Sequence, residues 1–186
     1  MSHRKILYFA YCANMLSNRM ECCVHKSVKR KETAKLEGYK MVYGQFSKIW
    51  YGTLPTIIKS PKNVVWGSTW EFEETYKQYL DELMGVGEGI YKPVTVELSS
   101  LKARGGTFPA LTYQLVKKPA QPTMKYGIIL KKYRPSKVYQ EQLLAGAEEA
   151  CLPLYYRKWL RSIRHNGYTG SVLPKLDVDI DPLKLD

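Results

Sequence analysis

The sequence predicts an α+β fold built on a mainly antiparallel β-sheet or β-barrel. Strand-like alternation of apolar and polar residues dominates the first two-thirds of the chain, and helical spacing dominates the last third. Strands and helices do not alternate regularly, as they would in a parallel α/β protein. The 186 residues are enough for one domain with its own hydrophobic core, which we expect to cover residues 1–172.

Strand patterns recur from the N-terminus onward. The clearest covers residues 64–72, where Trp66, Trp70 and Phe72 fall on one face of the expected strand. Residues 60–63, Ser-Pro-Lys-Asn, indicate a turn before it. The strands expected in chain order are 5–10, 36–46, 55–59, 64–72, 91–98 and 107–116, with loops at 50–53 and 117–126.

Helical spacing appears between and after these strands. Ser136 is a good N-cap for a helix that reaches residue 150, because its hydroxyl can accept a hydrogen bond from a free backbone N–H. The helices expected are 15–23, 74–84, 136–150 and 154–164. The last residues, 173–186, carry four aspartates and two prolines, and we expect an extended or loose tail.

The composition limits the classes of function. The net charge of +12 raises a basic binding protein for nucleic acid or anionic lipid as an alternative. The basic residues are spread along the chain without a nucleic-acid-binding motif, so a solvated surface is favoured. No apolar stretch approaches the ~20 residues of a membrane span. The four cysteines form no Cys-x-x-Cys pair, which predicts reduced thiols in the cytoplasm and no metal site.

One strand-to-loop passage has the features of a binding site. Where the expected strand 5–10 ends in small residues before a helix, backbone N–H groups are exposed and can hold a carboxylate or an oxyanion. We therefore predict that this passage binds the substrate. It consists of Tyr8, Phe9, Ala10, Tyr11, Cys12, Ala13 and Asn14.

This passage also resembles a family signature. Residues 11–14, Tyr-Cys-Ala-Asn, resemble the Tyr-Gly-Ser-Asn signature of the γ-glutamylcyclotransferases. Other family motifs follow in order: Val-Trp-Gly at 65–67, Leu-Asp-Glu-Leu-Met-Gly-Val at 80–86, Gly-Ile-Tyr at 89–91, Leu-Pro at 152–153 and Tyr-Thr-Gly at 168–170. The resemblance implies a small mixed β-barrel flanked by helices, with a polar cavity at one end.

The resemblance also implies a reaction. In this family a γ-glutamyl α-amine attacks its own γ-carbonyl, which gives 5-oxoproline and a released amine or amino acid, with no metal or organic cofactor. One carboxylate moves the proton, and Tyr139 matches a family position that lines the substrate site. The expected partner is a small-molecule ligand such as a γ-glutamyl compound, and a homodimer is left open.

The sequence departs from the family at the inferred site. The family's catalytic glutamate falls at Met84, and a thioether cannot accept a proton at useful pH, so no catalytic residue is assigned and weak or lost activity is expected. Cys12 replaces a glycine, whose backbone freedom cysteine lacks, and Ala13 replaces a serine.

Alternatives to a lost activity remain open. An active enzyme with a shifted substrate could use Glu88 as a substitute base, whereas Glu82 is two residues from Met84 on another side of the helix. The pocket could instead serve different chemistry or a more apolar ligand. Cys12 as a nucleophile is less favoured, because no histidine is placed near it in the sequence.

Overall fold

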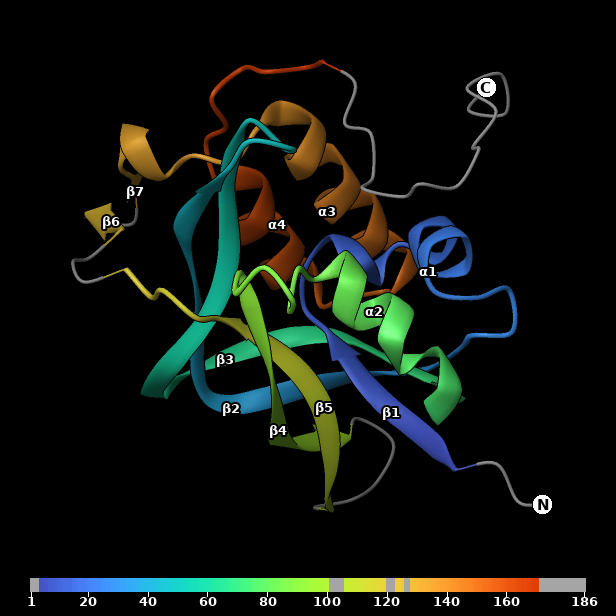
Figure 1. Ribbon diagram of the computed structural model, residues 1–186. Helices are drawn as coiled ribbons and strands as arrows, with labels where there is room; N and C mark the ends of the chain where they lie inside the picture. Colours follow the sequence, from blue (N-terminus) through green and yellow to red (C-terminus); the bar gives the residue numbers. More distant parts are fainter. Residues whose placement is uncertain (1–3, 101–105, 120–122, 126–127, 171–186) are drawn as a thin grey trace.

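The computed structural model describes residues 4–100, 106–119, 123–125 and 128–170 (Figure 1). Its centre is a closed barrel in the order β1-β3-β2-β4-β5. The strands are β1 (Lys5–Ala10), β2 (Lys29–Ser47), β3 (Gly52–Glu73), β4 (Tyr91–Ser100) and β5 (Thr107–Leu115). The α+β class with a mixed, mainly antiparallel barrel is thereby confirmed.

The barrel closes between its first and last strands. β1 pairs antiparallel with β3 from Lys5↔Glu73 to Ala10↔Ser68, and it meets β5 in parallel at Tyr8↔Leu111. The other strand pairs are antiparallel. A parallel contact needs no hairpin, so the two strands can come from distant parts of the chain.

The β2–β3 hairpin corrects two predictions. Residues 60–63 are not a turn that separates two strands, because β3 continues through them. The register shifts between Glu37 and Tyr39, and the partner of Tyr39 is Lys59 while that of Glu37 is Val64, so the additional β3 residues form a bulge. β2 also begins at Lys29 rather than at residue 36, because the chain pairs with β3 from Lys29↔Glu71 onward while the side chains of Lys29 and Lys31 are exposed.

The helices lie mainly where expected, with different starts. They are α1 (Ser17–Cys23), α2 (Lys77–Leu83), α3 (Lys137–Glu149) and α4 (Leu154–Ser162), with 3-10 turns η1 (Ala13–Met15), η2 (Glu74–Tyr76) and η3 (Lys131–Tyr133). The predicted helix 74–84 is thus a 3-10 turn followed by a short α-helix. The Ser136 cap is confirmed, because its Oγ accepts a hydrogen bond from the Tyr139 N–H at 3.2 Å.

The predicted loop 117–126 and the predicted tail 173–186 have different outcomes. The expected loop 117–126 contains β6 (Met124–Lys125), which pairs with β7 (Ile128–Ile129). The predicted tail 173–186 lies outside the described residues.

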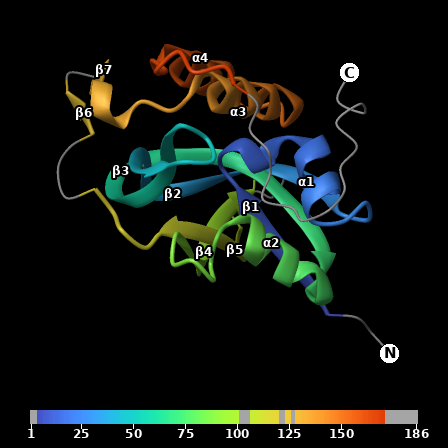
Figure 2. The same cartoon turned by 45° about the horizontal axis from the view of Figure 1, so that its top comes forward.

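The helices cover the barrel from more than one side. Figure 2 shows α3 and α4 together over the β2–β3 side, with α1 and α2 near β1. α3 comes close to η1 at Gly146, where a Cβ would lie 2.7 Å from the Leu16 backbone nitrogen. This close approach fixes the segment that follows β1 against α3, which positions the cavity described next.

Candidate functional site

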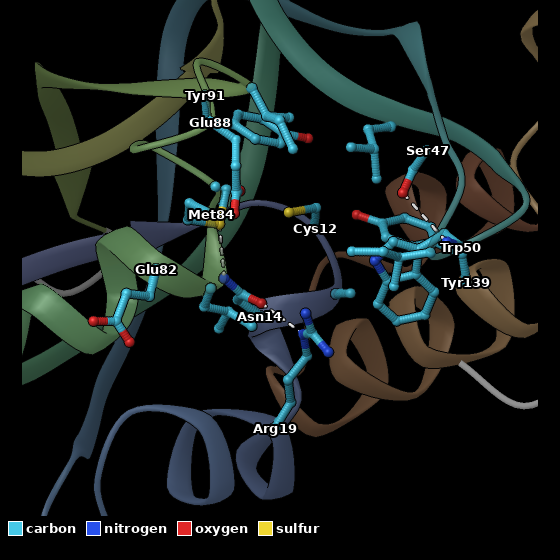
Figure 3. Close-up of a pocket in the computed structure, with 16 residues that line it drawn as sticks. Cys12, Asn14, Arg19, Ser47, Trp50, Glu82, Met84, Glu88, Tyr91 and Tyr139 are labelled. Atoms are coloured by element: carbon cyan, nitrogen blue, oxygen red, sulfur yellow. Dashed lines mark hydrogen bonds between the residues drawn. The ribbon is translucent and has the colours of Figure 1, made fainter. Parts of the chain in front are cut away.

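A cavity opens where β1 runs into η1 (Figure 3). Its volume is about 70 Å³. The lining comes from four parts of the fold. They are the residues after β1 with η1 and α1, the β2–β3 turn with the strand ends beside it, the stretch from the end of α2 to the start of β4, and α3. The lining residues are Cys12, Ala13, Asn14, Arg19, Ser47, Ile49, Trp50, Leu54, Glu82, Leu83, Met84, Gly85, Glu88, Ile90, Tyr91 and Tyr139.

The end of β1 is held close to β3. Gly67 stands beside it, and a Cβ on Gly67 would lie 2.3 Å from the Ala10 carbonyl oxygen, so only glycine fits there. Cys12 then has φ −138° and ψ −149°, and this negative φ lies outside the left-handed region that favours glycine. The expectation that Cys12 would disturb a glycine conformation is therefore wrong.

The polar contacts in the cavity converge on the side chain of Asn14. Its Nδ2 donates to the Tyr8 hydroxyl at 3.1 Å and to the Met84 Sδ at 3.4 Å. Its Oδ1 accepts from Arg19 Nε at 2.8 Å. Because Asn14 is buried and all of these groups converge on it, the amide orientation is fixed by its partners.

Arg19 brings a positive charge to the cavity. Its guanidinium lies 5.0 Å from the centre of the Trp50 ring, which is a cation–π distance. Its Nε is used by Asn14, and among the described residues no carboxylate forms an ion pair with its Nη atoms. The guanidinium can therefore accept an anionic group of a ligand.

Comparisons with known proteins find relatives of this chain in sequence and in fold. The model of the AIG2-like family matches residues 64–160. The γ-glutamylcyclotransferase of Bos taurus is 33% identical over 175 residues, covering 92% of this chain and 85% of that protein. The chain belongs to the γ-glutamylcyclotransferase family. The γ-glutamylcyclotransferase of Homo sapiens is 30% identical over 175 residues, which again cover 92% of this chain and 85% of that protein. A solved structure described as a γ-glutamyl cyclotransferase superposes with a TM-score of 0.79 at 29% identity, covering 91% of this chain and 94% of that one.

The buried polar side chains of this family member are neutral at physiological pH. Burial raises the pKa of the Cys12 thiol, although the neighbouring Tyr139 hydroxyl opposes the shift. Burial likewise raises the pKa of Tyr8, Tyr91 and Tyr139 well above their ordinary value. A protonated thiol or phenol is a poor base, so these groups can donate hydrogen bonds but do not take up a proton.

Two carboxylates belong to the cavity lining, and they are placed differently. Figure 3 shows the Glu82 side chain turned away from Asn14 and Met84, whereas Glu88 turns back toward Met84. A Cβ added to Gly85 would lie 2.7 Å from Glu88 Oε2, so this carboxylate folds over Gly85 next to Met84. Glu88 is thus the lining carboxylate that turns toward Met84.

The structure brings together only part of the predicted site. Cys12, Ala13, Asn14 and Tyr139 line the cavity together with Met84. The other predicted binding residues, Tyr8, Phe9, Ala10 and Tyr11, are buried in the barrel and are not among the lining residues. Strand β1 runs through the barrel wall, so only its exit reaches the cavity. Their contact with a ligand stays a prediction.

The barrel residues next to the cavity have structural partners instead. The Tyr11 hydroxyl donates to the Tyr113 carbonyl at 2.7 Å, which ties β1 to β5. Tyr8 accepts the Asn14 amide and so reaches the cavity through that residue.

Sequence reasoning missed Arg19 and Trp50. Arg19 follows Asn14 by five residues, but nothing in this spacing marks the two as partners. Trp50 comes from the turn between β2 and β3, and only the folded hairpin carries it to α1 and α3. The edge contact of Trp50 with Tyr139, 4.8 Å between ring centres, completes this wall.

The described residues contain neither a cluster of metal-ligating side chains nor a membrane-spanning helix. In residues 4–100, 106–119, 123–125 and 128–170, His, Cys, Asp and Glu form no cluster of three or more that could hold a metal ion. No helix in the described part of the chain has the length and apolar character needed to cross a membrane.

Proposed function

We propose that this protein binds a small carboxylate-bearing ligand of the γ-glutamyl class in the Asn14 cavity and has weak or no 5-oxoproline-forming activity. The observation that carries the proposal is Met84 Sδ, which sits 3.4 Å from Asn14 Nδ2 at the position where the family motif has its glutamate. Met84 is 8% exposed, so its thioether is part of the cavity wall and not a surface residue.

The reaction makes three demands on such a site. The attacking α-amine must lose a proton, the leaving nitrogen must gain one, and the carbonyl oxygen must be stabilised as it becomes negative. Backbone N–H groups at residues 12–14 and the Asn14 amide are the candidates for the last task. The thioether of Met84 cannot perform the first two, and general acid–base help is typically worth about 10²–10⁴ in rate.

Ligand binding requires less than catalysis. The Arg19 guanidinium, held by Asn14 and stacked on Trp50, offers a positive charge for a ligand carboxylate. Charge-assisted hydrogen bonds of this kind are stronger than neutral ones. The Tyr139 hydroxyl adds a neutral donor beside Trp50 on the same wall. These groups support binding whether or not a base is present.

The test uses the purified full-length protein with γ-glutamyl-alanine. Release of 5-oxoproline measures turnover, and titration calorimetry with 5-oxoproline and with γ-glutamyl-alanine measures binding. We expect binding with little or no turnover. Turnover typical of enzymes, with kcat of about 1 s⁻¹ or more, overturns the weak-activity part, and absence of binding overturns the ligand part.

A second candidate is an active cyclotransferase that uses Glu88 as its base. It is favoured by the position of the Glu88 carboxylate, which folds over Gly85 toward Met84. Under this candidate Glu88→Gln abolishes whatever turnover the wild type has, while Glu82→Gln leaves it unchanged because that side chain turns away. Equal turnover in all three proteins excludes Glu88.

The location and assembly of the protein remain proposals as well. Cys12, Cys22, Cys23 and Cys151 are all free thiols, which is typical of a reducing compartment such as the cytoplasm. A homodimer stays a prediction, and light scattering of the purified protein tests it.

A further inference from the structure

A second and larger cavity lies on another part of the molecule. Its volume is about 750 Å³, within the range of about 300–1,000 Å³ common for small-molecule sites. It shares no lining residue with the Asn14 cavity. We call it the α4 groove, and it is lined by Lys40, Met41, Val42, Ile58, Lys62, Asn63, Val64, Pro119, Thr123, Met124, Tyr155, Tyr156 and Trp159. Pro119 and Thr123 precede β6, and the other lining residues belong to β6, α4 and the β2–β3 hairpin, which Figure 1 labels.

One wall of the groove is aromatic and fixed in place. It consists of Tyr155, Tyr156 and Trp159 of α4. The Tyr155 hydroxyl accepts a hydrogen bond from Trp66 Nε1 at 2.5 Å, which anchors the ring although it is 62% exposed. The Tyr156 and Trp159 ring centres are 5.0 Å apart. Such a wall offers flat apolar surface at low entropic cost, because these rings are already ordered.

The facing wall comes from the β2–β3 hairpin and is aliphatic. The hairpin contributes Met41 and Val42 of β2 and Ile58 and Val64 of β3 to the lining, and Met124 of β6 adds to the same surface. An aliphatic wall opposite an aromatic wall fits an apolar ligand body and gives it no hydrogen bonds.

The polar groups of the groove are positive or unsatisfied. Lys40 and Lys62 are exposed at its edge, and within the described ranges neither pairs with a carboxylate. No aspartate or glutamate is among the described lining residues. The Thr123 Oγ1, in a residue only 2% exposed, has no hydrogen-bond partner in the described part of the chain. A buried hydroxyl without a partner is costly, so a ligand group that hydrogen-bonds to Thr123 would gain from it.

We propose that the α4 groove binds an amphiphilic anion, a small molecule with an apolar or aromatic body and one anionic head. The body lies between the α4 rings and the hairpin, and the head lies near Lys40 and Lys62. The two lysines attract the head, and the absence of a lining carboxylate leaves nothing to repel it. This inference does not depend on the function of the Asn14 cavity.

The test uses the full chain and the fluorescent probe 1-anilinonaphthalene-8-sulfonate, with decanoate as competitor. We expect saturable binding that decanoate reverses. The double variant Lys40→Gln/Lys62→Gln should weaken binding about tenfold, since a charged hydrogen bond contributes about 1.5–3 kcal/mol and these heads are solvent-exposed. Trp159→Leu should weaken it by removing the ring. The matched control Lys92→Gln, an exposed lysine of β4, should leave the affinity unchanged.

Other results overturn the proposal. Equal affinity in the wild type and the Lys40→Gln/Lys62→Gln variant, with thermal unfolding curves alike, means that the probe does not use these charges. Weaker binding in Arg19→Gln instead means that the probe sits in the Asn14 cavity. Higher affinity in a chain ended after Gly170 means that the acidic residues 171–186 compete for the groove and are its occupant. Displacement by an oligonucleotide but not by decanoate means that the basic surface binds nucleic acid.

Discussion

The Asn14 side-chain amide donates a hydrogen bond to the Met84 thioether at 3.4 Å. Sulfur is a weak acceptor, whereas a carboxylate at the same place would take this hydrogen bond strongly. The Asn14 amide donor therefore lies beside Met84 without a strong acceptor there. This relationship leads to the first prediction.

Met84→Glu should create or raise cyclotransferase activity. The new carboxylate would meet the Asn14 amide and lie near Arg19, and it would supply the proton carrier that the site lacks. We expect 5-oxoproline release from γ-glutamyl-alanine to increase by about 10²–10⁴. The control is Met84→Gln, which has the same shape and polarity but no basic oxygen. Equal rates for both variants would mean that the rest of the cavity no longer supports the reaction.

Arg19→Gln should weaken the binding of carboxylate ligands. The guanidinium is the cation of the Asn14 cavity, and loss of one charged hydrogen-bonding group typically costs about 1.5–3 kcal/mol, or about 10–100-fold in affinity. Calorimetric titration with 5-oxoproline measures the change, and Arg164→Gln, on the exposed segment after α4, is the matched control. The role of Arg19 is rejected if 5-oxoproline amide, which lacks the charge, binds the wild type as well as 5-oxoproline does.

The stability of the protein should fall in mildly alkaline solution because of Cys12. Burial raises the pKa of its thiol. An unfolded cysteine ionises near pH ~8.5. Above that pH the unfolded chain releases a proton that the folded chain keeps, so the free energy of unfolding decreases with rising pH. Below it both states are protonated and Cys12 contributes no pH dependence.

Urea unfolding between pH ~8 and ~9.5 measures this decrease, a range set by the ordinary cysteine pKa. Cys12→Ala should flatten the slope. Cys23→Ala should flatten it too, because burial also raises the pKa of Cys23. The exposed Cys22→Ala serves as the matched cysteine control. A wild-type slope retained in Cys12→Ala would assign the effect to other groups.

Gly67→Ala should destabilise the barrel where β1 meets β3. The added Cβ would lie 2.3 Å from the Ala10 carbonyl oxygen and 2.7 Å from the Phe9 ring, and neither can move without displacing β1. Overpacking of this kind typically costs about 1–3 kcal/mol. Chemical denaturation measures the loss. Gly87→Ala is the control, because its Cβ would meet nothing within 4 Å. Equal stability of the two variants would show that β1 shifts freely.

The sequence predicted the parts of the fold that local patterns determine. The alternation at 64–72 and 91–98 and the Ser136 cap each depend on neighbouring residues, and each appears as expected in β3, β4 and α3. The continuity of β3 through residues 60–63 could not be seen. A bulge and a turn share the same proline and polar residues, and only the pairing with β2 distinguishes them.

The candidate site could likewise be predicted only in part from the sequence. Cys12, Asn14 and Met84 were found because they belong to short motifs that remain recognisable in order along the chain. Arg19 and Trp50 were not, because their contact depends on how α1 and the hairpin turn pack in three dimensions. Tyr11, which follows β1, was assigned to the ligand since a motif shows proximity in the chain, not which side of the barrel wall a ring faces.

The β2–β3 hairpin takes part in both cavities: its turn supplies Ser47 and Trp50 to one, and its middle supplies Met41 and Ile58 to the other. Side chains alternate along a strand, so the loss of a single residue between Tyr39 and Tyr43, where β2 pairs with β3 without a register shift, would reverse the outward and inward faces of everything on one side of the gap. This stretch can therefore accept many substitutions but hardly any change in length. Relatives with the same ligands should differ here in residue type and agree in residue number.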